Sequence, residues 1–508
     1  MHIGGACHFN PLTKLMHLMK LNPKLLAGLI GPILFLLILF FFRPEGLSDQ
    51  AAAVLACTVW IALWWIFEVT DISVTALLPI VLFPLSGAME LSPTTASYGH
   101  KYIFLYMGGF ILAITIEKWN LHKRIALSII NVIGTGISSI ILGFMIATAF
   151  MSMWISNTAT SVMMLPIGLA IISQLKDHPD TEENENTLFG KALMLSIAYS
   201  ASIGGMATLI GTPPNLVLAG VVAELYGVEI SFAQWFKFGL PISIILLVIC
   251  WWYLTKVAFR FKMDEFPGGR QEIRRLLKGL GKITYEEKLV LTVFVGTAIL
   301  WITRSYLKKH FIPQLDDTII AIIAGLTLFL LPSSKKGEPI IRWQEAVKMP
   351  WGIIILFGGG MALASGFQSS GLAEWIGSQF SLLEALPLFL IIFVLVAAVN
   401  FLTEITSNLA TTAMLLPILA PIALSIDVHP YMLLVAATVA ASCAFMLPVA
   451  TPPNAVVFGS GYLTIPDMVK RGFWLNVFSI ILLSFIVYFV LSGLWGFDPD
   501  TFPAEFRS

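Results

Sequence analysis

The chain has 508 residues, of which 57% are hydrophobic and only 12% are charged. This composition excludes an ordinary water-soluble domain and indicates an all-α polytopic membrane protein. Thirty Lys and Arg residues balance thirty Asp and Glu residues, so the charge indicates no nucleic-acid partner.

Apolar segments long enough to cross a bilayer recur along the chain. A window of roughly twenty residues predicts about eleven transmembrane helices. They lie near residues 25–42, 52–67, 73–88, 102–117, 191–222, 233–255, 288–303, 317–331, 350–370, 430–458 and 473–495. The first follows a basic N-terminus without a cleavage site, so we expect it to be retained as a span.

Two further apolar stretches do not fit as single spans. The first, Ile125 to Leu175, contains no charged residue and no His. As one helix it would be roughly 75 Å long, against a hydrocarbon core of about 30 Å. The second, Leu383 to Ser425, contains only Glu384 and Glu404 as charged residues. We therefore predict that each stretch is a re-entrant helical hairpin that enters and leaves the membrane on one side.

Basic residues in short loops favour the cytoplasm. Eleven crossings and two hairpins put almost every strongly basic loop on one side. We therefore predict a multi-pass protein of the cell membrane, plasma or bacterial inner, with a cytoplasmic N-terminus and an extracytoplasmic C-terminus. The basic segment "RFKMDEFPGGRQEIRRLLKGLGK" is predicted to be an amphipathic helix at the cytoplasmic membrane surface.

Three motifs occur twice, in the same order. "LYMGGF" at Leu105 is followed 251 residues later by "LFGGGM". "SNTATSVMMLPI" at Ser156 and "SNLATTAMLLPI" at Ser407 are also 251 residues apart and agree at eight of twelve positions. "GTPPNLVLAG" at Gly211 and "ATPPNAVVFG" at Ala450 complete the series. With one hairpin opening to each side, this order predicts an inverted repeat, which is typical of secondary transporters.

The Ser-Asn and Thr-Pro-Pro-Asn motifs suit helices that are interrupted inside the membrane. A lone Ser-Asn pair more often serves helix packing, but its duplication favours a binding site. A Ser or Asn oxygen can cap the half-helix that follows and leave further amides free for an anion. Proline suits the first turn of a new helix, while the carbonyls before it lose their partners and become ligands for Na⁺.

Positive side chains are missing from the segments that carry these motifs. Neither Met349 to Val469 nor the first hairpin contains Lys or Arg. An anion bound between the hairpins therefore needs helix dipoles or metal ions for its positive charge. This favours cotransport with Na⁺.

These motifs resemble those of the divalent anion/sodium symporter family over nearly the whole chain. The first Ser-Asn-Thr motif of that family is intact here, whereas the second has Leu409 in place of Thr. The resemblance implies a substrate site formed by Ser156, Asn157, Thr158, Ser407, Asn408, Leu409 and Pro452. It implies two or more bound Na⁺ ions, one held by Ser152, Ser156, Asn157 and the Ser200 to Gly205 break, another by Thr403, Thr406, Asn408 and Ala450.

The resemblance further implies a homodimer in the membrane lipid and an elevator mechanism. We divide the chain into scaffold helices (1–124), a first transport half (125–260), a linker with further scaffold helices (261–370) and a second transport half (371–508). The expected function is Na⁺-coupled symport of a divalent anion, with a C4 dicarboxylate such as succinate favoured. An exchanger of dicarboxylate or citrate that Na⁺ does not drive, or a sulfate symporter, remains an alternative.

Other functions find less support. The sequence lacks the HExxH motif and paired intramembrane aspartates, so we do not expect an enzyme. Glu404 is either a functional intramembrane carboxylate or a structural one that holds the hairpin turn. His178 and His429 are interpreted as surface residues rather than proton carriers.

Overall fold

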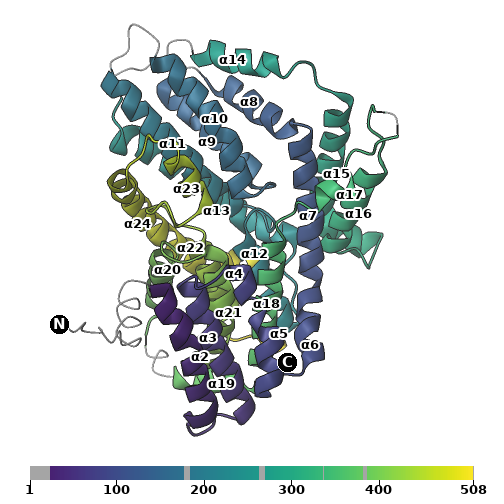
Figure 1. Ribbon diagram of the computed structural model, residues 1–508, viewed down its shortest axis with the longest axis vertical. Coiled ribbons are helices and arrows are strands. Elements are labelled where there is room, and N and C mark those ends of the chain that lie inside the picture. The colour runs from purple at the N-terminus through teal and green to yellow at the C-terminus, as the bar shows by residue number, and fades with distance from the viewer. Residues whose placement is uncertain are drawn as a thin grey trace, which may run out of the picture.

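The computed structural model describes residues 23–134, 136–176, 183–261, 269–335, 337–380 and 386–506. In these ranges the chain is helical, with an isolated β-bridge between Pro332 and Pro339. Nine helices of this part are long and apolar enough to cross a membrane. Figure 1 shows them packed in an elongated bundle. The basic N-terminus and His178 lie outside the described residues.

The first helices match the predicted spans, with one difference. They are α2 (Pro23–Phe41), α3 (Asp49–Ile66), α4 (Ile72–Thr75), α5 (Leu78–Ser86), α6 (Leu91–Ala96) and α7 (Lys101–Lys118). The third predicted span is not one helix, because it breaks between α4 and α5. Pro79 at the start of α5 has no amide to continue the ladder. The carbonyl of Ala76 in the break accepts a hydrogen bond from the Tyr98 hydroxyl instead.

The first apolar stretch forms a hairpin, but a shorter one than predicted. Its helices are α8 (Leu121–Ile133), α9 (Ile137–Ser152) and α10 (Asn157–Lys176). The predicted start at Ile125 is wrong, because residues up to Ile133 belong to the separate helix α8. Gly134, with φ of 144°, ends that helix in a conformation that other residues rarely adopt. The hairpin is therefore α9 and α10, which turn at residues 153–156.

The predicted span at 191–222 is broken at the Thr-Pro-Pro-Asn motif, as expected. Helix α11 (Glu183–Gly205) ends before the motif and α12 (Pro213–Tyr226) begins with it. Helix α13 (Phe232–Trp252) follows and continues into a π-helical turn, Tyr253–Ala258.

The middle of the chain contains α14 (Gly269–Gly279), α15 (Tyr285–His310), α16 (Asp317–Leu330), α17 (Trp343–Ala346), α18 (Trp351–Ser370) and α19 (Leu372–Gln379). Helix α14 confirms the helical part of the predicted amphipathic segment. Residues 262–268 of that segment lie outside the described part.

The last part repeats the pattern of hairpin and broken helix. Its elements are α20 (Leu388–Leu402), α21 (Asn408–Ser425), α22 (Pro430–Ala441), α23 (Pro452–Phe458), α24 (Ile465–Phe489) and α25 (Leu491–Trp495). Helices α20 and α21 form the second predicted hairpin, and the break between α22 and α23 again lies at Thr-Pro-Pro-Asn. In Figure 1 the α9–α10 hairpin lies in the upper half of the molecule and the α20–α21 hairpin in the lower half.

The first part of each broken helix packs against the hairpin of its own half. Helix α11 packs against α9 and α10, and α22 packs against α20 and α21. Every residue of α22 is buried. Gly204 lets α11 approach so closely that a side-chain carbon there would overlap the backbone of Ala149 in α9. The second parts cross over, because α12 packs against α21 and α22, and α23 packs against α10 and α11. The two hairpins and the two broken helices therefore form one packed unit.

A cluster of charged residues joins this packed region to α7, α15 and α16. Arg304, which is 5% exposed, lies 2.9 Å from Asp317 and 2.8 Å from Glu229. Lys101 lies 3.1 Å from Asp316 and 3.6 Å from Glu229. Glu229 belongs to the loop between α12 and α13, whereas its partners Lys101 and Arg304 belong to α7 and α15. We call these five residues the ion-pair cluster.

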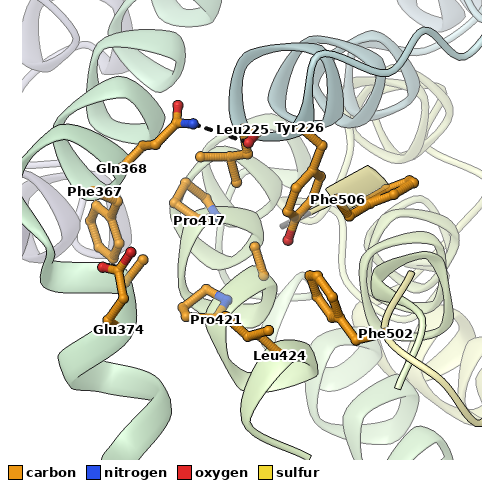
Figure 2. A pocket seen from close by; sticks show the side chains of 12 residues that line it. Leu225, Tyr226, Phe367, Gln368, Glu374, Pro417, Pro421, Leu424, Phe502 and Phe506 are labelled. Atoms are coloured by element: carbon orange, nitrogen blue, oxygen red, sulfur yellow. Dashed lines mark hydrogen bonds between the residues drawn. The ribbon is translucent and has the colours of Figure 1, made fainter. Parts of the chain in front are cut away.

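The C-terminal tail folds back over the ends of α12 and α21. Figure 2 shows Phe506 of the tail beside Tyr226 and Phe502 near Leu424. These four side chains line a cavity of about 120 Å³. His429 lies under the same tail with 3% of its surface exposed, so the prediction of a surface histidine is wrong. The centre of its ring is 4.1 Å from that of Phe497, and aromatic packing explains its burial.

The burial of His429 predicts a pH-dependent stability. Burial lowers the pKa of His429 from 6.5 to about 4. As the pH falls below 6.5 the unfolded chain takes up this proton first, so the contribution to stability is complete above pH 6.5 and is lost towards pH 4. The variant His429→Asn keeps a helix-capping side chain without a titratable ring. We expect the melting temperature to fall less between pH 7 and pH 4.5 in this variant than in the native protein. Equal falls would contradict the assignment.

Candidate functional site

Both hairpin tips and both helix breaks meet at one cavity of about 230 Å³. Its lining contains residues 156–158 and 407–409 of the tips and residues 211–214 and 451–453 of the breaks. All the residues predicted to contact substrate line this cavity: Ser156, Asn157, Thr158, Ser407, Asn408, Leu409 and Pro452. The structure thus brings together two motifs that are 251 residues apart.

Helix N-termini point at the cavity. Helices α10, α12 and α21 begin at Asn157, Pro213 and Asn408, and the short α23 begins at Pro452. The first amides of a helix have no partner within it, and the N-terminus has a partial positive charge. The cavity therefore lies at the positive ends of several helices.

The serine of each hairpin tip caps the helix that follows, as predicted. The Ser156 hydroxyl accepts a hydrogen bond from the amide of Ala159 at 3.2 Å, and Ser407 accepts one from Ala410 at 3.5 Å. These caps leave the first two amides of α10 and of α21 for a ligand. The prolines that begin α12 and α23 have no amide to offer, so those helices contribute their dipoles alone.

The walls of the cavity are neutral. Among the described residues that line it, none has a charged side chain. The lining also contains the apolar side chains of Ile72, Phe110, Ile210 and Ile353. The cavity thus offers donors for an anion at the hairpin tips and apolar contact for a carbon chain.

Oxygens gather behind the first tip. The Ser152 hydroxyl lies 2.5 Å from Oδ1 of Asn157 and 2.6 Å from the carbonyl oxygen of Ala201. One hydroxyl proton can serve only one of these acceptors. The same end of the Asn157 amide lies 3.3 Å from the Ala201 carbonyl and 3.2 Å from the Gly211 carbonyl. If Oδ1 of Asn157 occupies this end, it and the oxygens of Ser152, Ala201 and Gly211 converge as the ligands of a hard cation do. If the amide is rotated, its NH₂ group donates to the other three oxygens instead.

The second tip repeats this arrangement. The Thr403 hydroxyl lies 2.6 Å from Oδ1 of Asn408 and 3.0 Å from the carbonyl oxygen of Ala441. Thr403 and Asn408 follow Ser152 and Asn157 by 251 residues each. Again two acceptors compete for one hydroxyl proton. Each half of the protein therefore has a group of oxygens behind its hairpin tip, which we call its oxygen cluster.

The other residues predicted to hold Na⁺ are placed less uniformly. Gly205 adjoins the first oxygen cluster, since a side-chain carbon there would overlap the amide of Asn157. Ala450 directly precedes Thr451, which lines the cavity. In contrast, the Ser200 hydroxyl donates to carbonyls of its own helix, and the Thr406 hydroxyl lies 2.7 Å from that of Thr411. The structure does not bring these two hydroxyls to the oxygen clusters.

The asparagine of each Thr-Pro-Pro-Asn motif holds its break together. Nδ2 of Asn215 donates to the carbonyls of Gly205 and Thr208 at 3.3 and 2.8 Å. Nδ2 of Asn454 donates to the carbonyls of Ala444 and Leu447 at 3.2 and 3.0 Å. These are equivalent positions, ten and seven residues before each Asn. The sequence analysis quoted both asparagines but gave them no role, because their partners are set by the folded break.

Glu404 supports the second break. Its carboxylate accepts hydrogen bonds from the amides of Phe445 at 2.7 Å, Met446 at 2.9 Å and Leu447 at 3.0 Å, and from the side chain of Asn476 at 2.7 Å. It is 3% exposed and does not line the cavity. Of the two interpretations left open, these contacts favour the structural carboxylate.

Tyr106 is a cavity residue that the sequence analysis did not select. It lies in "LYMGGF", the repeat noted for its glycines. Its hydroxyl is buried without a hydrogen-bond partner among the described residues, and its side chain lines the cavity. A repeated motif that contained a hydroxyl was the signal that could have identified it.

Comparison with known proteins decides the family. The model of the sodium:sulfate symporter transmembrane region matches residues 23–496. The chain belongs to the sodium:sulfate symporter family.

Curated relatives of this symporter are similar over almost their whole length. The sodium-dependent dicarboxylate transporter SdcS of Staphylococcus saprophyticus is 49% identical over 484 residues, which cover 94% of this chain and 93% of that protein. SdcS of Staphylococcus aureus strain USA300 is 48% identical over 481 residues, which cover 94% of this chain and 92% of that protein. The relatives are transporters by name, in agreement with the expectation that the chain is not an enzyme.

Two solved structures share the fold of this symporter. MtrF of Neisseria gonorrhoeae superposes with a TM-score of 0.57 over 95% of this chain and 97% of its own, at 11% identity. YdaH of Alcanivorax borkumensis superposes with a TM-score of 0.52 over 76% of this chain and 85% of its own, at 14% identity. YdaH is described as a transporter and MtrF as an efflux pump. The shared fold confirms the predicted polytopic helical fold.

The contacts of Glu404 predict the effect of its amide variant. Glu404→Gln keeps the shape but puts an NH₂ group where backbone amides need an acceptor. An unsatisfied buried donor costs about 1–3 kcal/mol, so we expect a lower melting temperature in detergent. Glu374→Gln on the exposed start of α19 is the control and should leave it unchanged. An unaltered melting temperature in Glu404→Gln would show that the carboxylate does not support the break.

Proposed function

We propose that this protein is a Na⁺-coupled symporter of a C4 dicarboxylate such as succinate. One observation supports this most strongly: a neutral cavity at several helix N-termini is flanked by two equivalent oxygen clusters. The names of the relatives, which specify sodium and dicarboxylate, agree with that chemistry.

The hairpin tips would bind the carboxylates. A carboxylate at the first tip can accept hydrogen bonds from the amides of Asn157 and Thr158 and from the Thr158 hydroxyl. At the second tip, the amides of Asn408 and Leu409 offer the same backbone contacts without the hydroxyl. The methylene groups between the carboxylates then lie against the apolar side chains of the lining.

Sodium would be a co-substrate at the oxygen clusters. One Na⁺ ion would bind at Ser152 and Asn157, and another at Thr403 and Asn408. At both places one hydroxyl proton faces two hydrogen-bond acceptors, so a cation would interact with the acceptor that lacks a donor. Each asparagine belongs both to a cluster and to the cavity lining. Bound Na⁺ therefore fixes the tips and adds positive charge beside the anion, so each ligand should increase the affinity for the other.

The proposed movement separates the transport halves from the scaffold. In the division given above, residues 125–260 and 371–508 move together, and residues 1–124 and 261–370 stay. The ion-pair cluster crosses this boundary, because Glu229 lies in the first transport half and Arg304 in the scaffold. An elevator movement must break these pairs, so they would stabilise one of the two end states.

We extend the proposal to assembly and orientation. The protein would be a homodimer joined through its scaffold helices in the lipid bilayer. The N-terminus would face the cytoplasm and the C-terminus the opposite side, so the α9–α10 hairpin opens inward and the α20–α21 hairpin outward.

Uptake into proteoliposomes tests the transport cycle. We expect replacement of external Na⁺ by K⁺ to lower uptake of labelled succinate at least about tenfold. The variants Asn157→Ala and Asn408→Ala remove a cluster oxygen and should each reduce saturable uptake by roughly tenfold or more, since hydrogen bonds to charged groups contribute about 1.5–3 kcal/mol. Asn131→Ala in α8, away from the cavity, should transport normally.

Three outcomes would contradict this proposal. Uptake that ignores Na⁺ but is stimulated by internal succinate would indicate an exchanger. Normal uptake by both cavity variants would remove the site assignment. Uptake of labelled sulfate, with no effect of succinate as a competitor, would indicate a sulfate symporter.

The difference between the two tips predicts a change of substrate preference. Leu409→Thr would give the second tip the hydroxyl that Thr158 supplies at the first. One added hydrogen bond contributes about 0.5–1.5 kcal/mol, so we expect the citrate-to-succinate ratio of kcat/KM to rise roughly three- to tenfold. Leu409→Val is the matched control, and an equal rise there would mean that side-chain volume, not the hydroxyl, sets the preference.

A further inference from the structure

A groove separate from the substrate cavity lies between the π-helical turn and α24. Its volume is about 460 Å³, and its lining includes Tyr253 and Val257 of the turn and Lys470, Arg471 and Trp474 of α24. It shares no lining residue with the substrate cavity. The function described so far does not use it.

The groove is positively charged. Lys470 is exposed at its edge. Arg471 lies 3.5 Å from Asp467, and its guanidinium is held 5.1 Å from the centre of the Phe259 ring. Asp467 is also paired with Lys191 at 2.8 Å, so it does not neutralise both residues of the Lys-Arg pair. A preorganised guanidinium beside an ammonium group is suited to a phosphate.

The groove lies where two apolar helices end. After Arg471, α24 has no charged residue from Gly472 to Phe489. Helix α13 likewise has none from Phe238 until the turn reaches Lys256. The basic residues therefore mark the level at which both helices leave the hydrocarbon core, which is the level of lipid headgroups.

Exposed apolar side chains continue from the groove along both helices. On α24, Trp474, Ile481 and Phe485 are 52%, 56% and 52% exposed, and their spacing places them on one face. On α13, Val248 and Trp252 are 53% and 50% exposed. A molecule with its phosphate in the groove could thus lay its acyl chains along these faces.

We propose that this groove binds an anionic phospholipid. The phosphodiester of the lipid would pair with Lys470 and Arg471, and its glycerol backbone would lie against Trp474. The acyl chains would follow the exposed faces of α13 and α24. A free phosphate would use only the two cations, whereas the apolar faces fit a lipid. Basic pockets between membrane helices recognise anionic headgroups by this combination. The site is independent of which anion the protein transports.

Thermal unfolding in detergent with added lipid tests this site. We expect dioleoyl phosphatidylglycerol to raise the melting temperature by about 3 °C or more, because a ligand of the folded state stabilises it. Dioleoyl phosphatidylcholine and glycerol 3-phosphate should give no such rise. Native mass spectrometry should show retained phosphatidylglycerol.

The variant Lys470→Gln should lose most of the rise and of the retained lipid. Lys309→Gln, at the end of α15, is the matched control and should keep both. Equal rises with the two phospholipids, an equal rise with glycerol 3-phosphate, or an undiminished rise in Lys470→Gln would each overturn the proposal. Because Lys470 is exposed, its replacement should not prevent folding, and the melting temperature without lipid checks this.

Discussion

The need to satisfy backbone groups at interrupted helices governs this structure. A helix that stops inside an apolar bundle leaves amides and carbonyls without water to bond to. Here side-chain amides and a carboxylate replace the missing helical partners. Asn215 and Asn454 donate to the carbonyls released at the two breaks, and Glu404 accepts three amides of the second. These hydrogen bonds stabilise the irregular backbone inside the apolar helix bundle.

The same interruptions produce the chemistry of the site. A helix that restarts at a break presents its positive end, and one that stops presents carbonyl oxygens. Because both kinds of end meet at the hairpin tips, one small region can favour an anion and a cation together. Asn157 and Asn408 lie at this junction, with cavity on one side and an oxygen cluster on the other. None of the described lining residues has a charged side chain, so the proposed binding of an anion would depend on these helix ends and on bound cations.

The two halves repeat their geometry but not all their chemistry. Position 153 is Met and its equivalent 404 is Glu, yet both contact the break that follows. In the first half the hydroxyl of Thr208 donates to the Met153 carbonyl at 2.5 Å. In the second, the amide of Leu447 donates to the Glu404 carboxylate at 3.0 Å. The same contact is thus made with different groups, and the differences at the tips and at Tyr106 make the cavity asymmetric.

The sequence by itself determined the hairpins, the breaks and the residues of the motifs that line the cavity. The length of apolar segments, the paired prolines and the motif repeated at a fixed spacing are signals in the sequence itself. They can be recognised without knowing how the helices pack. The separation of α8 and the break between α4 and α5 have local causes in Gly134 and Pro79 that the sequence analysis did not use. Tertiary structure alone decided the burial of His429 and the partners of Glu404. Each of these depends on residues distant in the chain or on the geometry of a folded break, as with Asn476 beside Glu404. Periodicity within one segment contains no information about what lies against it, because that is fixed only when the helices pack together.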